Sequence, residues 1–492
     1  MTAPVREGTS LRRSLSVWQA VGLSIALMAP SMAANINPQG TAGLVGRATP
    51  LAFLLAALAV LLIAYVFVRL CQYYKHAGSV YVFVGATLGA PAGAIAGLCL
   101  MGTYIFYALV TASAAGIFGS QFLDIIGVWN NQPSWSGFLV GFVALVLALF
   151  LAVVPAKRAA EVLLSVEGVT VALILVVSVV VLVKLLGGSA PNDASFTMKV
   201  FSVPSGTPTS DLFLGIIFGL LSFAGFEAAS TLGEETNNPQ RDIPRAILGT
   251  AIFGGIYFTV VTAIEMMGFG TSKAGVAAFI DSGNTKGTLG VLGSSYIGSW
   301  VGDLVTLGAA VSAFGCCLAC VVGGSRLLFA IVRDLAPGHP LGRTGASDTP
   351  AVAAMVVAVV VAAIGLVCKV LFSAVPFDTF LWSGTIGTLI LLVAYVLATL
   401  GCIKLIWVDK KMPQVPTWQI VIPVAAVVVI GYTLYRNVFP YPSSGPAHWF
   451  PIVAFGWVLL VALVAFLVPG FAQRLSVGLR QLDETEPEVL GG

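Results

Sequence analysis

The sequence predicts an all-α protein that crosses a membrane many times. Of its 492 residues, 58% are hydrophobic and only 9% are charged, and the mean hydropathy is +0.98. Soluble proteins carry about 25% charged residues, so this composition excludes an ordinary soluble domain. The 54 glycines and 25 prolines are embedded in apolar runs, where membrane helices tolerate them. The net charge of +3 is too small and too dispersed to indicate a nucleic-acid partner.

Twelve apolar runs are long enough to form membrane-spanning helices. A helix needs about 20 apolar residues to cross the hydrocarbon core of a bilayer. The first and eighth runs exceed this length, so we expect these two helices to be tilted or interrupted. The runs lie at about 17–44, 50–70, 91–118, 136–154, 160–186, 211–233, 244–270, 299–332, 350–373, 378–404, 417–436 and 449–468.

The distribution of basic residues predicts the orientation of these helices. If the tail 1–15 lies in the cytoplasm, 17 of the 24 Lys and Arg residues fall on the cytoplasmic side. Cytoplasmic loops of membrane proteins are enriched in Lys and Arg. An odd number of spans would spoil this bias, so it supports twelve. We therefore expect a multi-pass protein of the inner (cytoplasmic) membrane, with the tails 1–15 and 473–492 both in the cytoplasm.

The first apolar run contains a proline near its middle. Pro30 cannot donate a backbone hydrogen bond and clashes with the preceding helical turn, but it is well tolerated as the first residue of a helix. We therefore expect one half-helix to end near Met28 and a second to begin near Pro30. A simple proline kink is the other interpretation.

The sixth apolar run carries a glycine and a carboxylate, Gly225 and Glu227. An ionisable group within a membrane helix is costly and usually marks a substrate or ion pathway. A neighbouring glycine allows the helix to open where its backbone lines a cavity. The first and sixth helices would open two halves of five helices each. Interrupted helices at matching positions of two halves indicate the substrate site of a secondary transporter.

Two interrupted helices would expose backbone groups of opposite polarity. The amides of Ser31 and Met32, at the start of the second half-helix, suit a carboxylate. Carbonyl groups around Phe223, Ala224 and Gly225 suit an ammonium group or a metal cation. Both together fit a zwitterion such as an amino acid, although either end could serve a coupling ion instead.

At these residues the chain resembles the amino acid–polyamine–organocation superfamily of permeases. The similar residues are Gly225-Phe226-Glu227 and the stretch 235–247, which reads E-T-N-N-P-Q-R-D-I-P-R-A-I. Two weaker similarities are Arg333-Asp334 after the eighth run and Gly78-Ser79-x-Tyr81 before the third. The resemblance extends over helices one to ten, and the last two helices match only in number.

The resemblance implies a leucine-transporter-like fold with two inverted repeats of five helices and alternating access. The ten-helix core would cover 16–406, with repeats at about 16–190 and 211–406, and two extra helices would lie in 407–472. It also implies a substrate site between helices one, three, six, eight and ten. The unwound segments carried over from the family are Ala29, Pro30, Ser31, Met32 and Ala33 in the first helix, and Phe223, Ala224, Gly225, Phe226 and Glu227 in the sixth.

Two departures from the family pattern concern the ligands. Members often have a Gly-Ser-Gly break in the first helix, where this chain has Ala29-Pro30-Ser31. Some proton-coupled relatives carry a lysine in the fifth helix, and Thr170 aligns with it here. The resemblance therefore leaves the coupling ion open between H⁺, which we expect, and Na⁺.

Further polar and aromatic residues lie within the predicted spans. Glu227 is the expected proton-coupling or gating residue, because a carboxyl group in a low-dielectric interior favours its neutral form; a purely structural carboxylate is the alternative. Glu167 and Glu265 could select cationic substrates or gate the pathway, or pair with Ser, Thr or backbone groups. Candidate cavity residues, for which helix packing is an equal explanation, are Tyr104, Cys320 and Trp382.

The predicted function is secondary active transport of amino acids, cationic ones included, by proton symport or exchange. A polyamine or organic amine transporter and a non-transporting amino acid sensor are the alternatives. No H-E-x-x-H, G-x-S-x-G or Walker sequence is present, so we do not expect an enzyme. We expect no cofactor and no metal site, and the partners are the small-molecule substrate and the lipid bilayer. The sequence does not decide between a monomer and a homodimer.

Overall fold

The described part of the chain consists of helices joined by turns and loops. The computed structural model describes residues 17–74, 80–153, 157–232, 236, 238–335, 339–343, 349–442 and 445–467. The predicted tails 1–15 and 473–492, the pair Gly78-Ser79, and Glu235 and Asn237 of the sixth-helix signature lie outside these residues. Over the described ranges the prediction of an all-α protein is confirmed.

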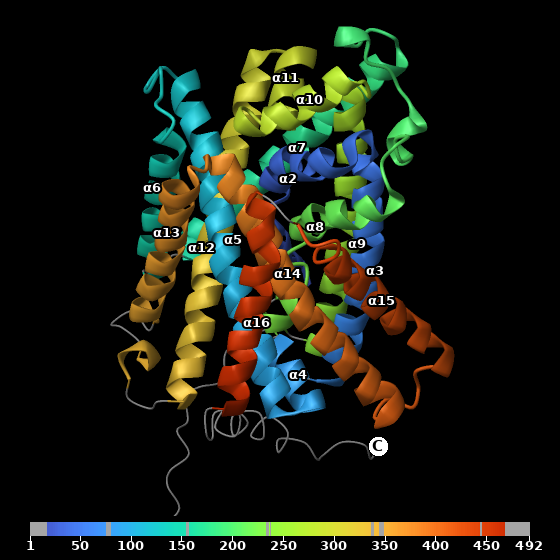
Figure 1. The fold of residues 1–492 in the computed structure, drawn as a ribbon, viewed down its shortest axis with the longest axis vertical. Helices are drawn as coiled ribbons and strands as arrows, with labels where there is room; N and C mark the ends of the chain where they lie inside the picture. Colours follow the sequence, from blue (N-terminus) through green and yellow to red (C-terminus); the bar gives the residue numbers. More distant parts are fainter. Residues whose placement is uncertain are drawn as a thin grey trace, which may run out of the picture.

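The described residues form sixteen α-helices, and several of the longest run roughly along the long axis of the molecule (Figure 1). Short 3-10 turns connect several of them. The helices are α1 (Val17–Met28), α2 (Pro30–Val45), α3 (Thr49–Tyr73), α4 (Val80–Leu88), α5 (Ala90–Ile125), α6 (Ser136–Val153), α7 (Lys157–Leu186), α8 (Leu212–Ser222), α9 (Pro239–Phe269), α10 (Lys273–Asp281), α11 (Thr288–Tyr296), α12 (Ser299–Leu335), α13 (Ala351–Phe372), α14 (Pro376–Ile403), α15 (Val421–Arg436) and α16 (Trp449–Leu467).

Ten helical segments of the described chain are long and apolar enough to cross a membrane. The first of them, Ser24–Tyr73, runs from α1 through α3, and so covers the first two predicted spans. The sixth predicted span corresponds to a shorter apolar segment, Thr209–Ser222. Every predicted apolar run thus falls on a described helix, and the protein is a multi-pass membrane protein. The number of twelve spans remains a prediction.

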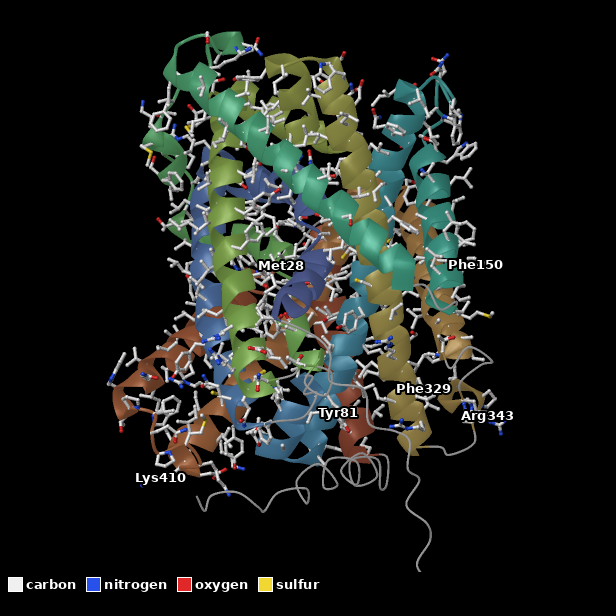
Figure 2. All side chains as sticks on the ribbon, turned by 180° about the vertical axis from the view of Figure 1, so that it is seen from behind. Met28, Tyr81, Phe150, Phe329, Arg343 and Lys410 are labelled. Carbon is white, nitrogen blue, oxygen red and sulfur yellow. The ribbon has the colours of Figure 1, made fainter. Side chains whose placement is uncertain are left out.

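The first predicted helix is interrupted where we expect it, between Met28 and Pro30. α1 ends at Met28, and Ala29 has left-handed backbone angles, φ 44° and ψ 57°. Pro30 is the first residue of α2, where its missing amide hydrogen costs nothing. The chain therefore forms two half-helices and not a simple kink. Figure 2 shows Met28 near the middle of the long axis.

The sixth predicted helix ends halfway along its apolar run. α8 stops at Ser222, residues 223–227 form turns, and a 3-10 helix follows at Ala228–Leu232. Gly225 has φ +96°, a conformation that L side chains rarely adopt. A Cβ at this position would lie 2.6 Å from Cβ of Leu27. The end of α1 can therefore approach this turn closely because residue 225 is glycine.

The longest helices form the interior of the bundle. α5 packs most extensively against α12 and α14, α3 packs against α9, and α2 packs against α8. α10 and α11 lie together at one end, and α4 lies towards the other (Figure 1). α15 and α16 pack on the outside of α14. The two interrupted helices pack against α3, α9, α12 and α14.

Candidate functional site

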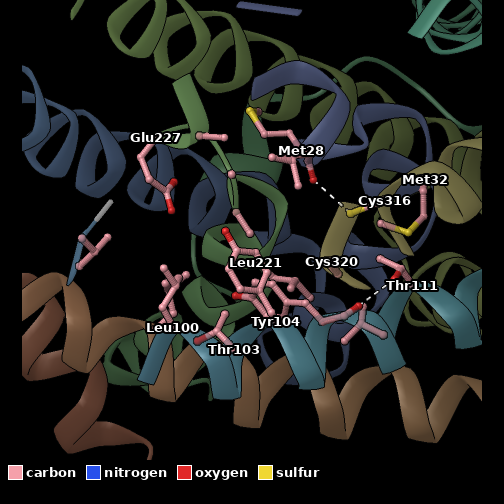
Figure 3. A pocket seen from close by; sticks show the side chains of 18 of the residues that line it. Met28, Met32, Leu100, Thr103, Tyr104, Thr111, Leu221, Glu227, Cys316 and Cys320 are labelled. Carbon is pink, nitrogen blue, oxygen red and sulfur yellow. Dashed lines mark hydrogen bonds between the residues drawn. The ribbon is translucent and has the colours of Figure 1, made fainter. Parts of the chain in front are cut away.

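A cavity of about 70 Å³ lies where the two interrupted helices face each other (Figure 3). The end of α1 and the start of α2 form one side, and the turn after α8 forms another. α5, α12 and α14, together with the first residue of α4, complete the lining. The lining residues are Leu27, Met28, Met32, Asn37, Val80, Leu100, Thr103, Tyr104, Tyr107, Val110, Thr111, Leu221, Ala224, Gly225, Glu227, Ala228, Ser230, Cys316, Cys320 and Leu391.

The structure brings six of the predicted site residues together in this lining. They come from four separate segments and are Met32, Tyr104, Ala224, Gly225, Glu227 and Cys320. The others at the two breaks do not line the cavity, but they are buried beside it; these are Ala29, Pro30, Ser31, Ala33, Phe223 and Phe226.

Trp382 does not line this cavity but lines two others, so its role at a substrate site stays a prediction. It stands near the start of α14, in contact with the ring of Phe372 at a centroid distance of 6.0 Å. Leu391, the residue of α14 that lines the cavity, follows nine positions later. At 1.5 Å per residue this separation corresponds to about 13 Å along the helix. The position of Trp382 within its apolar run did not reveal how far along α14 it lies from the cavity.

The carboxyl group of Glu227 has an open acceptor. Glu227 is 9% exposed, and its Oε2 has no hydrogen-bond partner among the described residues. Figure 3 shows its carboxyl group directed towards the cavity. Three tyrosines, Tyr104, Tyr107 and Tyr395, lie close enough to interact with its charge. A carboxylate with an unused oxygen beside aromatic rings is suited to an ammonium group.

Tyr395 is a residue of this site that the sequence analysis missed. Its ring packs edge-on against Phe226, with centroids 6.1 Å apart, and its hydroxyl lies close to the carboxyl group of Glu227. The hydroxyl of Tyr107 instead lies 2.9 Å from Oγ1 of Thr388. The only signal for Tyr395 in the sequence is a polar aromatic residue within the apolar run of α14.

The carbonyl groups predicted to be free after α8 are partly used by the turn. The carbonyl of Phe223 accepts from the amide of Phe226 at 3.0 Å, and that of Gly225 accepts from Ala228 at 2.9 Å. The unwound segment therefore retains turn hydrogen bonds, because it folds back on itself and does not open fully. Among the side chains that line the cavity, Oε2 of Glu227 and Oδ1 of Asn37 have no partner among the described residues.

The two amides predicted to be free at the start of α2 also have partners. The amide of Ser31 donates to Oε1 of Glu167 at 2.8 Å, and the amide of Met32 donates to Oγ of Ser312 at 3.2 Å. These partners come from α7 and α12, which pack on this end of α2. The prediction of free amides is therefore wrong for this structure, and Glu167 pairs with the backbone.

Glu265 and Thr170 are buried outside the cavity. Oε1 of Glu265 accepts from Oγ1 of Thr288 at 2.8 Å, and its Oε2 has no partner among the described residues. Thr170 donates to the carbonyl of Val166 at 2.9 Å. A Cβ added at Gly308 of α12 would lie 2.2 Å from this threonine. Thr170 therefore packs between α7 and α12, where their backbones approach closely.

Comparisons with known proteins point to one family. A family model described as amino acid permease matches residues 15–464. The branched-chain amino acid permease BcaP of Lactococcus lactis is 26% identical over 378 residues, which are 75% of this chain and 76% of that protein. The low-affinity putrescine importer PlaP of Escherichia coli K12 is 26% identical over 417 residues, 83% and 84% of the two chains. An uncharacterised transporter of Mycobacterium tuberculosis is 32% identical over 218 residues, which are 43% of this chain and 45% of that protein.

Proposed function

Because the chain belongs to the amino acid permease family, we propose that it moves small organic amines across the bacterial inner membrane by alternating access. These amines are amino acids or polyamines. The named relatives are permeases and importers, and the chain is a transporter and not an enzyme. Amino acids and polyamines share an ammonium group. The observation that carries the proposal is the open Oε2 of Glu227 in the cavity between the two interrupted helices.

The transported ammonium group would lie against Glu227 and the rings of Tyr104 and Tyr107. A buried carboxylate gains a charge-assisted hydrogen bond from an ammonium group, and the aromatic faces add cation–π attraction. The apolar part of the substrate would lie against Leu100, Leu221 and the other aliphatic residues of the lining.

Alternating access is supported by the position of the two breaks. α1 and α2 meet at Ala29, and α8 ends beside them at Ser222, so each interrupted helix can tilt as two separate halves. We propose twelve spans in two inverted repeats of five, at about 16–190 and 211–406, followed by α15 and α16 within 407–472. Both termini would lie in the cytoplasm.

The proposed coupling ion is the proton, carried by Glu227. When protonated, this carboxyl group would lose its attraction for an ammonium group, so protonation and substrate release would be linked. Exchange of internal for external substrate and coupling to Na⁺ are the alternatives.

Uptake into proteoliposomes tests this proposal. Radiolabelled amino acids and polyamines are offered under a proton gradient, under a sodium gradient, or with unlabelled substrate inside. We expect accumulation above equilibrium under the proton gradient, and its loss in Glu227→Gln with binding still detectable. Accumulation only with preloaded substrate would identify an exchanger. Binding without movement of any amine would identify a sensor and contradict the proposed transport.

A further inference from the structure

The start of α2 is an anion-binding position that a side chain of the same protein fills. The first amides of a helix lack intrahelical partners and lie at the positive end of its dipole. In this structure Oε1 of Glu167 lies 2.8 Å from the amide of Ser31, and Ser312 accepts from the amide of Met32. Glu167 is 5% exposed, and Ser312 is also 5% exposed. The occupied position is thus deeply buried.

We propose that Glu167 stands in place of a substrate carboxylate, so that the permease selects aliphatic amines that lack a carboxylate over the corresponding amino acids. This inference rests on the function proposed above and names its substrate class; Ser31 and Glu167 are buried beside the cavity, and the residue after Ser31, Met32, lines it. Glu167 is a specificity-determining residue in this proposal, and it acts by occupying the amide of Ser31.

A substrate carboxylate could reach the amide of Ser31 only by displacing Glu167. The displaced side chain would remain buried without its backbone donor, and an unpaired buried carboxylate is costly. If both carboxylates stayed at the helix start, two like charges would share one site. Either arrangement disfavours an amino acid relative to the same molecule without its carboxylate.

The described lining of the cavity offers no cationic side chain to a carboxylate. None of the described residues that line it is Lys, Arg or His, and Glu227 is the carboxylate among them. Three of its polar side chains already donate to protein acceptors. Nδ2 of Asn37 donates to Oγ of Ser222 at 2.6 Å, Oγ1 of Thr103 to the carbonyl of Cys99 at 3.1 Å, and Oγ1 of Thr111 to the carbonyl of Tyr107 at 2.8 Å. The lining therefore favours a cation with an apolar chain.

Three matched pairs of compounds test the selection directly. Putrescine and ornithine, cadaverine and lysine, and agmatine and arginine differ within each pair only by the carboxylate. Full-length protein in proteoliposomes is assayed for uptake of each compound and for inhibition by its partner. We expect the amine of each pair to be bound at least tenfold more tightly than the amino acid. Equal binding, or preference for the amino acid, would overturn the inference.

Substitution of Glu167 tests the cause of the selection. Glu167→Ala opens the amide of Ser31, and we expect the amine-to-amino-acid ratio to fall about tenfold or more. Glu167→Gln is the matched control, because its amide oxygen can still accept from Ser31, and its ratio should stay above that of Glu167→Ala. An unchanged ratio in folded Glu167→Ala would contradict the proposal.

Two further outcomes keep the test decisive. If Glu167→Ala does not fold, Ser312→Ala opens the amide of Met32 and should lower the ratio in the same direction; no change there would count against the inference. If neither member of any pair binds or moves in the wild-type protein, the proposed function fails as well. If amino acids move in preference to amines, only the inference about Glu167 fails.

Discussion

Two residues, Ala29 and Gly225, give the backbone the conformations on which the cavity depends. Both have positive φ, 44° at Ala29 and +96° at Gly225. Ala29 separates the half-helices α1 and α2, and Gly225 allows the turn after α8 to touch Leu27. At Gly225 the residue type suits the conformation, whereas at Ala29 the Cβ makes the left-handed conformation costly by about 1–2 kcal/mol.

Gly225→Ala is expected to destabilise the protein by about 1–3 kcal/mol and to abolish transport. The added Cβ would lie 2.6 Å from Cβ of Leu27, and the backbone conformation would be strained. Thermal unfolding of the detergent-solubilised protein and uptake assays measure the two effects. Gly249→Ala is the control, because a Cβ at this position of α9 meets nothing within 4 Å. Equal stability of the two variants would contradict the prediction.

Ala29→Gly is expected to raise the free energy of unfolding by about 1 kcal/mol, because glycine adopts the left-handed conformation without a steric cost. The same substitution at Ala33, inside α2, should lower it by about 1 kcal/mol. Thermal shift assays on the two variants compare these opposite signs. A loss of stability in Ala29→Gly would show that the left-handed backbone conformation at Ala29 is not a source of strain.

At the scale of elements, α2 is tied to the two short helices α10 and α11. Oδ1 of Asn35 accepts from the amides of Leu289 and Gly290, at 3.1 and 3.2 Å, in the first turn of α11. Nε2 of Gln39 donates to Oγ of Ser282, just after α10, at 3.1 Å. Asn35 thus supplies the hydrogen-bond acceptor that the start of α11 needs. A movement of α2 would therefore be transmitted to α10 and α11.

Asn35→Leu is expected to lower the free energy of unfolding by about 2–4 kcal/mol, because it leaves two buried amides without an acceptor. Hydrogen exchange of Leu289 and Gly290 should increase more than that of α9. Asn437→Ala serves as the control, since its side chain makes one local bond, to the carbonyl of Thr433, and should cost about 1 kcal/mol or less. Unchanged exchange at α11 would argue against the connection.

At the scale of the whole molecule, the polar loops gather at the two ends of the helix bundle. Figure 2 shows Tyr81, Arg343 and Lys410 near one end, and Figure 1 shows α10 and α11 at the other. By the positive-inside rule we expect Arg343 and Lys410 to lie in the cytoplasm. The outer helix α15 is joined to the start of α8 by an ion pair between Arg436 and Asp211, at 3.1 Å.

Cysteine labelling tests this orientation. Lys273→Cys, at the start of α10, should react with a membrane-impermeant maleimide in intact cells. Lys410→Cys should react only after the membrane is opened. Both positions are exposed, whereas six of the seven native cysteines are buried, which keeps the background low. The reverse labelling pattern would place the termini outside the cytoplasm.

The sequence by itself determined most of the helices and both of the breaks, because these features depend on neighbouring residues. Apolar runs predicted the positions of the described helices other than α4, α10 and α11, and Pro30 predicted the break between α1 and α2. Gly225 and Glu227 marked the turn after α8, because a flexible residue and a carboxyl group in an apolar run are visible locally.

The partners of these segments were decided only by the tertiary structure. Glu167 is 136 positions from Ser31, and Ser312 is 280 positions from Met32, yet they fill the amides that the sequence left free. Tyr395 lies beside Glu227, and Trp382 lies away from it, although both belong to α14. The rotation and depth of each helix determine which side chains meet, and both follow from the packing of distant helices and not from the local sequence.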